Sequence, residues 1–446
     1  MKTSSLSLIG AALCSLSVST QFILAQGSLI PPGAPAPTMK TLDQIEPRTP
    51  INHLPFVINR PGSYYLTTNL TANPGGIGIW TNNVTLDLMG FEVDGSGGSG
   101  VGIGVLPGVA NICIRNGSVH NWNLGGIYLS GATNCLLQDL RVSGNFGDGL
   151  VAGDASVVSR CVATLNNGDG IVGGKNCSVL GCLAFTNTMN GIRVAEGGVV
   201  RDCSATRNGG RGMMTGWGST IGDCTASYNV SSGIRAGDAC TVRDCSAYFN
   251  KGHGITDDSS VLGAPGLSIV NCAATGNDQD GFFLGNGSTV KNCLAKGNKL
   301  IGIETFYGST IVDCSANDNF GTGISLLAQS TLNGCTAANN GTNGVEVEKQ
   351  CVITGCTVIA NHGHGIHVTQ DSNRLDGNTV RDNNKDGISV DATAVKNVVV
   401  RCTSGGNANF QYRVPGIPGQ PPVGANVVGP IVTDATTANA WANLSL

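Results

Sequence analysis

Charged and aromatic side chains that could act on a sugar polymer gather in the middle of this 446-residue sequence, in which only 12% of residues are charged. Basic groups come first, carboxylates follow, and aromatic side chains lie among them: Arg193, Arg211, Arg235, His253, Asp257, Asp258, Asp280, Glu304, Trp217, Phe283, Phe306 and Tyr307. A guanidinium group pairs bidentately with a carboxylate, and aromatic faces stack on sugar rings. Aspartate oxygens are suitable ligands for Ca²⁺. The set predicts a binding site for an acidic polysaccharide, with Ca²⁺ as a candidate cofactor.

A repeat of about 21 residues must position these side chains. A glycine followed by an apolar residue marks each unit, at Gly126, Gly149, Gly170, Gly191, Gly212, Gly233, Gly254, Gly281, Gly302, Gly323, Gly344, Gly365 and Gly387. Short runs within each unit alternate apolar and polar residues with period two, which predicts strands rather than helices. A strand that short cannot bury its apolar face alone, whereas coils stacked about 4.8 Å apart can. The repeat therefore predicts a solenoid of parallel strands, with equivalent residues aligned in columns.

Two of these columns consist of a single residue type. The first is cysteine, at Cys161, Cys182, Cys203, Cys224, Cys245, Cys272, Cys293, Cys314, Cys335 and Cys356. The second is asparagine, at Asn166, Asn187, Asn208, Asn229, Asn250, Asn277, Asn298, Asn319, Asn340 and Asn361. Parallel side-chain directions fit disulfide geometry poorly, so we expect free thiols that fill a narrow interior. Asparagine tolerates the left-handed backbone of a sharp turn, and stacked amides can hydrogen-bond along the stack.

The pattern N-x-x-x-G-I-x-V, followed by I-x-x-C-x-A, resembles the repeat of right-handed parallel β-helix proteins of the pectate-lyase-like superfamily. Residues 61–66 (PGSYYL) and 84–90 (VTLDLMG) resemble the entry region of its bacterial secreted members, and the resemblance covers roughly residues 51–405. It implies an all-β fold, a single-stranded right-handed parallel β-helix (solenoid) of about 14 coils with N- and C-terminal caps. The superfamily includes lyases, hydrolases, epimerases, binding proteins and adhesins, so the fold alone does not determine the function.

The two ends of the chain differ from the repeats. Lys2 precedes an apolar stretch at residues 6–18, and cleavage after Ala25 fits a secretory signal peptide. We expect a signal peptide at 1–25, a Pro-rich linker at 26–50, an N-terminal cap with the first coils at 51–100, parallel β-helix repeats at 101–405 and a C-terminal cap at 406–446. This organisation predicts a bacterial protein that is secreted, periplasmic or on the cell surface. A net charge of −4 argues against nucleic acid as a partner, and no apolar run after residue 25 is long enough to span a membrane.

The resemblance also implies a reaction. In the lyases of this superfamily, Arg, Lys or Ca²⁺ neutralises a uronate carboxylate, a basic group takes the C5 proton, and the bond to O4 is eliminated. By that analogy Arg235 or His253 is the base, Asp280 completes the catalytic set, and Asp257 and Asp258 hold Ca²⁺. Substrate contacts would come from Arg193, Arg211, Trp217, Phe283, Glu304 and Tyr307. Because one face of each strand points outward, we expect these side chains on outward columns, with the extra residues around Asp258 as one wall of a groove.

Three other functions remain open. Hydrolysis needs two carboxylates about 5 to 10 Å apart, which Asp258, Asp280 and Glu304 could supply, although the N-T-D and R-I-K motifs of β-helix polygalacturonases are missing. The second is a non-catalytic extracellular or cell-surface solenoid with a binding or structural role. The third is a periplasmic metal-binding protein, with transition-metal ligands at His362, His364 and His367. An enzyme, unlike an inert solenoid, needs a groove with shifted pKa values in the arginine-rich region.

Overall fold

The repeat units form β-strands, and the part of the chain that the structure describes contains no helix. The computed structural model describes residues 47–71, 75–96, 99–257, 266–414, 426–433 and 440–445. The predicted signal peptide, the linker up to residue 46, and Asp258 lie outside these ranges. No helix that could cross a membrane is found within them. The strands all belong to the unit Arg48–Leu446.

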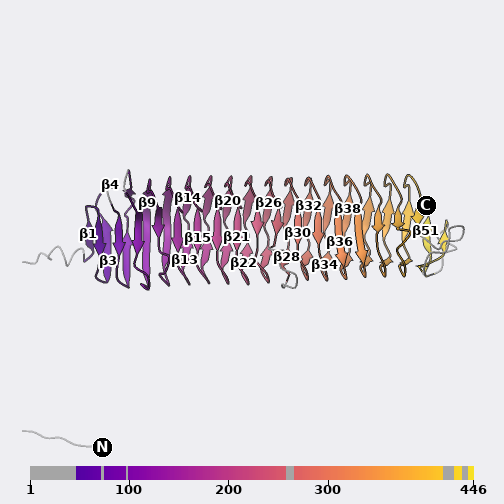
Figure 1. The fold of residues 1–446 in the computed structure, drawn as a ribbon, viewed down its shortest axis with the longest axis horizontal. Coiled ribbons are helices and arrows are strands. Elements are labelled where there is room, and N and C mark those ends of the chain that lie inside the picture. Colours follow the sequence, from indigo (N-terminus) through magenta and orange to yellow (C-terminus); the bar gives the residue numbers. More distant parts are fainter. Residues whose placement is uncertain are drawn as a thin grey trace, which may run out of the picture. The chain divides into compact units, whose positions relative to one another are not determined.

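One parallel sheet contains one strand from each coil, and we call it the site sheet. Its strands are β2 (Phe56–Ile58), β5 (Ile77–Ile79), β8 (Val101–Val105), β10 (Gly125–Tyr128), β12 (Leu150–Ala152), β15 (Ile171–Gly173), β18 (Ile192–Val194), β21 (Met213–Thr215), β24 (Ile234–Arg235), β27 (Ile255–Thr256), β30 (Phe282–Leu284), β33 (Ile303–Thr305), β36 (Ile324–Ala328), β39 (Val345–Lys349), β42 (Ile366–Val368), β45 (Ile388–Val390) and β48 (Tyr412–Arg413). Each strand pairs in parallel with the equivalent strand of the next coil, as β15 does with β18 (Figure 1). Outward side chains therefore line up along the axis.

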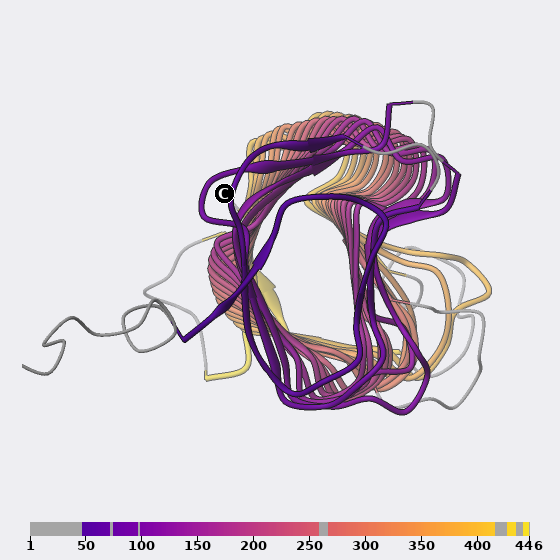
Figure 2. The same ribbon diagram turned by 90° about the vertical axis from the view of Figure 1, so that its left-hand side faces the viewer.

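A second sheet of 34 strands forms the other two sides of each coil. A regular coil contributes two short strands to it, such as β13 (Val157–Ser159) and β14 (Val162–Thr164). The chain bends between them at a residue with positive φ, 52° at Arg160 and 54° at Asp202. Near the N-terminus, β9 (Ile112–His120) and β11 (Leu136–Ser143) run through the bend without interruption. Viewed along the axis, successive coils superpose (Figure 2).

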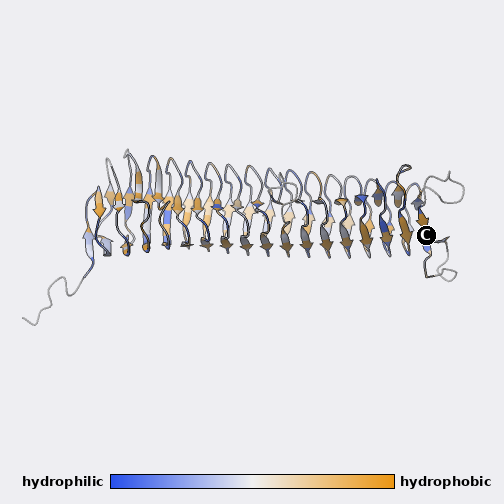
Figure 3. Ribbon diagram, turned by 60° about the horizontal axis from the view of Figure 1, so that its bottom comes forward, coloured by the Kyte–Doolittle hydropathy of each residue, from blue (hydrophilic) through white to orange (hydrophobic). Residues whose placement is uncertain are grey.

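The interior is filled by columns of small and branched apolar side chains. Ile171 and Ile192 of the site sheet are fully buried, as are Val179 and Val200 on a facing side. Apolar residues recur in coil after coil along the axis (Figure 3). Every cysteine in the described residues is free and all but Cys113 are buried, which confirms the prediction of buried thiols. Burial is the main cause that raises the pKa of the Cys177 thiol to about 12.

The asparagine column forms a continuous hydrogen-bond ladder. The Nδ2 group of Asn166 donates to Oδ1 of Asn187 at 2.9 Å and to the Val142 carbonyl at 3.2 Å. Its backbone N–H donates to the same Oδ1 at 3.1 Å, and Asn187 repeats the pattern on Asn208. The expectation that asparagine itself adopts the left-handed backbone is wrong. That conformation belongs to the residue before it, with φ of 57° at Leu165, so the amide is left in position to bond along the stack.

The solenoid makes about 16 turns in the described residues, compared with the 14 coils that the repeat predicts. The first coils account for the difference. The register Ile77↔Ile103 takes more residues per turn than Ile171↔Ile192, and this irregular length hides the repeat in the sequence.

Candidate functional site

The site sheet brings most of the predicted site residues onto one face. Its outward column runs Arg193, Met214, Arg235, Thr256, Phe283, Glu304, each paired with the next. The neighbouring column, just before each repeat glycine, runs Asn190, Arg211, Ser232, His253, Asp280. Successive coils lie about 4.8 Å apart. Along the axis, the two columns therefore present arginines first, then a histidine and then carboxylates, within a few coils.

His253 and Asp280 form the best-defined pair in this face. Nδ1 of His253 lies 3.1 Å from Oδ2 of Asp280, and the two side chains are 21% and 5% exposed. Oδ1 of Asp280 accepts the Ile301 backbone N–H at 2.7 Å, which fixes the carboxylate. The imidazole stacks on the ring of Phe283, with centroids 4.7 Å apart and planes at 17°. Two groups of Asp280 compete for Nδ1: its carboxylate at 3.1 Å, which favours a proton on Nδ1, and its backbone N–H at 3.4 Å, which favours the lone pair there. In the tautomer with the proton on Nδ1, the lone pair of Nε2 is available as a base.

Glu304 lies one coil beyond Phe283 and is half-buried. Burial raises the pKa of its carboxyl group, the negative charges of Asp280 and Glu346 raise it further, and His253 opposes them. Glu304 therefore stays protonated to a higher pH than an exposed glutamate does. A carboxyl group that keeps its proton to a higher pH, within electrostatic reach of an imidazole, can act as the proton donor while the imidazole acts as the acceptor.

Arg235 lies on the other side of His253. Burial lowers the pKa of its guanidinium, the nearby charge of Arg211 lowers it further, and Asp257 and Asp238 oppose the shift. Nη1 of Arg235 lies 3.8 Å from Sδ of Met214. Arginine keeps its charge at neutral pH, so Arg235 is better suited to pair with a substrate carboxylate than to act as the base.

The two remaining arginines, Arg193 and Arg211, differ in whether their Nε groups have hydrogen-bond partners. Nε of Arg193 donates to the buried Asp169 at 2.6 Å, and Asp169 also accepts from Asn190. Nε of Arg211 is buried and has no hydrogen-bond partner among the described residues. Arg211 therefore has an unsatisfied donor inside the protein, whereas Arg193 is already oriented by its own carboxylate.

Two predicted aromatic contacts lie in the turns beside the site sheet. Trp217 and Tyr307 follow β21 and β33 at equivalent positions, and they are 64% and 41% exposed. They are available to solvent, but the structure places them at the edge of the face rather than over His253.

Of the two predicted calcium ligands, Asp257 and Asp258, the structure describes only Asp257. Asp257 follows the end of β27 in register with the core residues Ala236 and Leu284, and it is 8% exposed. Its Oδ2 accepts the backbone N–H of Gly285. Asp258 lies outside the described residues. No group of three or more His, Cys, Asp or Glu side chains in the described ranges could hold a metal ion, and this includes His362, His364 and His367.

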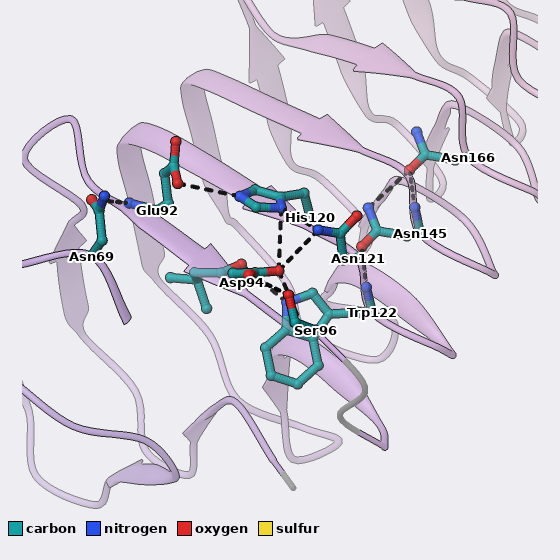
Figure 4. A network of polar contacts seen from close by, with 10 residues as sticks. Asn69, Glu92, Asp94, Ser96, His120, Asn121, Trp122, Asn145 and Asn166 are labelled. Atoms are coloured by element: carbon teal, nitrogen blue, oxygen red, sulfur yellow. Dashed lines mark hydrogen bonds and ion pairs between the residues drawn. The ribbon is translucent and has the colours of Figure 1, made fainter. Parts of the chain in front are cut away.

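A polar network on the first coils was missed by sequence reasoning. His120 of β9 lies between two carboxylates of β7 (Glu92–Asp94), with Nε2 3.6 Å from Glu92 and Nδ1 3.4 Å from Asp94 (Figure 4). Burial would raise the pKa of Asp94, but hydrogen bonds from Ser96 and Asn121 and the charge of His120 hold it below its ordinary value. The irregular length of these coils leaves no periodic signal that would align the three residues.

Two surface hollows also lie on the N-terminal half, and neither contains a predicted site residue. One, of about 320 Å³, lies between Asn116, Asp139 and Arg160. The other, of about 280 Å³, is lined by apolar residues and glycines around Phe56 and Trp80.

Comparison with known proteins identifies the family. The model of the right-handed β-helix region matches residues 62–199, 173–289, 213–352 and 260–404, which together cover more than half of the chain. The chain belongs to this family of right-handed parallel β-helix proteins. No curated protein matches the sequence.

Several solved structures are similar over much of the chain. The A-module of a mannuronan C-5 epimerase from Azotobacter vinelandii has 15% identity and a TM-score of 0.34, over 86% of this chain and 91% of its own. An alginate lyase from Paenibacillus has 10% identity and a TM-score of 0.30, over 59% of this chain and 90% of its own. The catalytic domain of an α-1,3-glucanase has 13% identity and a TM-score of 0.28, over 69% of this chain and 60% of its own.

Proposed function

We propose that the protein acts on an acidic polysaccharide, which it cleaves by β-elimination on the site sheet. The observation that carries this proposal is the His253–Asp280 pair, with Nδ1 and Oδ2 3.1 Å apart, between an arginine-rich stretch and a glutamate with a raised pKa. A cation for the uronate carboxylate, a base for the C5 proton and an acid for the leaving oxygen are the three groups that elimination needs.

The arginines act first on the bound substrate. Arg235, with Arg211 beside it, pairs with the carboxylate at C5 and withdraws electron density, which makes the C5 proton more acidic. Nε2 of His253 then takes that proton, and the C5–H electron pair forms the double bond between C4 and C5. O4 leaves with the electron pair of the C4–O4 bond and takes a proton from Glu304. Asp280 stabilises the imidazolium through Nδ1.

The steps above use only this chain's own side chains: the Oδ2 atom of Asp257 accepts the Gly285 backbone N–H, and Asp258, the other predicted calcium ligand, lies outside the described residues. Phe283 stacks on the imidazole of His253 and keeps it in place, and the ring of Phe306 contacts Phe283 in turn. The chain of sugars would run parallel to the solenoid axis, because the supporting side chains are arranged along that axis.

The experiment is a screen of the mature protein on pectate, alginate, glucuronan and glycosaminoglycans, which follows the ultraviolet absorbance of the unsaturated product. We expect H253Q to lower kcat by about 10²- to 10⁴-fold, as loss of a general base does. R235A should raise KM and also lower kcat, because Arg235 both holds the substrate carboxylate and makes the C5 proton more acidic, and the exposed R207A variant is the matched control. Activity that survives both H253Q and R235A contradicts this site.

A non-catalytic binding solenoid is the second candidate, and one observation favours it. Arg193 already pairs with Asp169, and His253 already pairs with Asp280, so these groups have partners within the protein. Under this alternative no substrate gives unsaturated products or new reducing ends, yet acidic polysaccharide still binds.

We also infer that the protein is exported from a bacterial cell after removal of residues 1–25, with 26–50 as linker and 406–446 as the C-terminal cap. The basic Lys2 and the apolar stretch before Ala25 support this inference. N-terminal sequencing of the extracellular or periplasmic protein tests it, and retention of residue 1 in that fraction contradicts it.

A further inference from the structure

A second histidine on the site sheet repeats the arrangement of His253. His364 also stands between two glycines just before a site-sheet strand, β42 in this case. Its Nδ1 lies 3.2 Å from Oδ2 of Asp386, the residue in the same column one coil further on. The corresponding distance at His253 is 3.1 Å. The backbone N–H of the aspartate approaches Nδ1 at 3.3 Å in one case and 3.4 Å in the other.

The aspartate of this second pair also accepts a backbone N–H, while its buried Oδ2 has no hydrogen-bond partner among the described residues. Asp386 is fully buried, its Oδ1 accepts the Phe410 N–H at 3.1 Å, and Nη1 of Arg413 lies 3.8 Å from its Oδ2. Burial lowers the pKa of His364 more than the charge of Asp386 raises it. His364 is therefore largely neutral at pH 7, and no described residue hydrogen-bonds to its Nε2.

A second imidazole covers His364 and is itself oriented. The rings of His364 and His367 stack with centroids 5.1 Å apart, where Phe283 takes that place at His253. Nε2 of His367 lies 2.9 Å from Asp391, and Asn343 approaches its Nδ1 at 3.5 Å. Asn343 also donates to Glu346 at 2.8 Å and accepts the His364 backbone N–H. These contacts hold the polar side chains of this cluster in place, although packing of the core does not require polar side chains at these positions.

The cations near His364 are exposed. Arg413 lies in the outward column of β48, two coils beyond His367, and its side chain is 59% exposed. Lys385 precedes Asp386 and is also exposed. A carboxylate placed over His364 would therefore meet a guanidinium and an ammonium group at about the distances that coil stacking sets.

The two clusters are parts of one row. Between them the same columns hold the uncharged Ile301, Thr322 and Ser325, with Glu304 on the side of the first cluster and Glu346 on the side of the second. His253 and His364 are separated by five coils, or about 24 Å along the axis. A sugar chain that runs along the sheet would meet an ionic cluster, a neutral stretch and a second ionic cluster.

We propose that His364, His367 and Arg413 form a second binding site for the same class of acidic polysaccharide, about 24 Å along the site sheet from His253. The sugar class rests on the function proposed above, whereas the existence of the site rests on its own geometry. A chain long enough to span both clusters binds at both, and the second contact becomes intramolecular. Long chains therefore bind more tightly than short ones.

The experiment uses the imidazole NMR signals of the protein, which has six histidines. Oligogalacturonates and oligomannuronates of increasing length are titrated into histidine-labelled protein, and single His→Gln variants assign the signals. We expect saturable shifts at His253 and at His364 and His367. Shifts at His253 alone overturn the second site and leave the proposed function standing. Shifts at His364 and His367 alone support the second site and count against the first, and no shift at any of the three overturns both.

Variants test the length dependence. H364Q should weaken binding of oligomers that reach about 24 Å by about tenfold or more and leave the affinity of short oligomers for the His253 site unaffected. H362Q is the matched control, because His362 is exposed in the turn only two residues away. R413Q removes the exposed cation and leaves the buried pair of His364 and Asp386 unchanged. Equal losses for short and long oligomers, or no loss in both H364Q and R413Q, overturn the proposal.

Discussion

At the scale of the residue, Glu304 shows how the fold sets the charge of a site. Its pKa is raised by burial and by Asp280 and Glu346, so the folded chain holds this proton more tightly than the unfolded chain does. Stability linked to Glu304 is therefore fully present below its ordinary pKa of 4.5 and is lost as the pH rises through the raised value. The E304Q substitution replaces the carboxyl group with a neutral amide and so removes this loss of stability at higher pH.

We expect urea midpoints of wild type and E304Q to be similar at pH 4 and to separate at pH 7, with E304Q the more stable. E196Q is the control, because Glu196 is exposed and makes only a surface ion pair with Lys175. A wild type that gains stability relative to E304Q between pH 4 and pH 7 would show that the carboxylate, not the acid, is the form that this site favours.

At the scale of the element, the asparagine ladder joins each coil to the next through side chains. Asn166 accepts from the backbone and Nδ2 of Asn145 and donates to Asn187 and to the Val142 carbonyl. N166A would leave several of these buried groups without partners, at about 1–3 kcal/mol each. We expect it to lower the free energy of unfolding by about 2–4 kcal/mol.

Its neighbour supplies the control. Asn167 is exposed, and N167A should change the free energy of unfolding by less than about 0.5 kcal/mol. Denaturant titration of both variants measures the difference. A ladder that contributes nothing to cohesion between coils would give equal values for the two.

The elements also show what the sequence could predict. The step from Gly170 to Gly191 and the cysteine and asparagine columns were enough to predict strands, stacking and free thiols, because stacked coils repeat every environment. Parallel register then brought His253, Asp280, Phe283 and Glu304 together as expected. The placement of these four residues near one another follows from the repeat alone.

The repeat alone does not determine how side chains are directed within a coil, nor the length of irregular coils. Asp257 follows β27 in register with core residues, and its Oδ2 accepts the Gly285 N–H. His364 and Asp386 share one periodic column, but their pairing needs the side-chain geometry of a turn, and the network of His120 and Asp94 lies in coils of irregular length. In each case the deciding quantity is a side-chain direction or a local chain length.

At the scale of the whole molecule, a solenoid depends on its ends, because each coil contacts only its neighbours. At the C-terminus β46 (Val398–Val400) pairs with β49 (Val427–Val428), and β47 (Thr403–Gly405) pairs with β51 (Asn443–Ser445). Asn443 continues the polar ladder: its Oδ1 accepts from Cys402 at 2.9 Å and its Nδ2 donates to Val399 at 3.0 Å. The hydroxyl of Tyr412 donates to the carbonyls of Cys402 and Leu444.

Removal of residues 426–446 would therefore expose the edges of β46 and β47, and open strand edges recruit strands from other molecules. We expect the truncated chain to form species larger than the full chain does at the same concentration, as measured by size-exclusion chromatography with light scattering. Y412F, which loses two hydrogen bonds but keeps the strands covered, should elute like wild type and lose about 1–2 kcal/mol of stability. A truncated chain of unchanged size and unfolding midpoint would mean that the edge of β46 and β47 is protected by its own side chains, and that the segment after Asn426 serves another purpose.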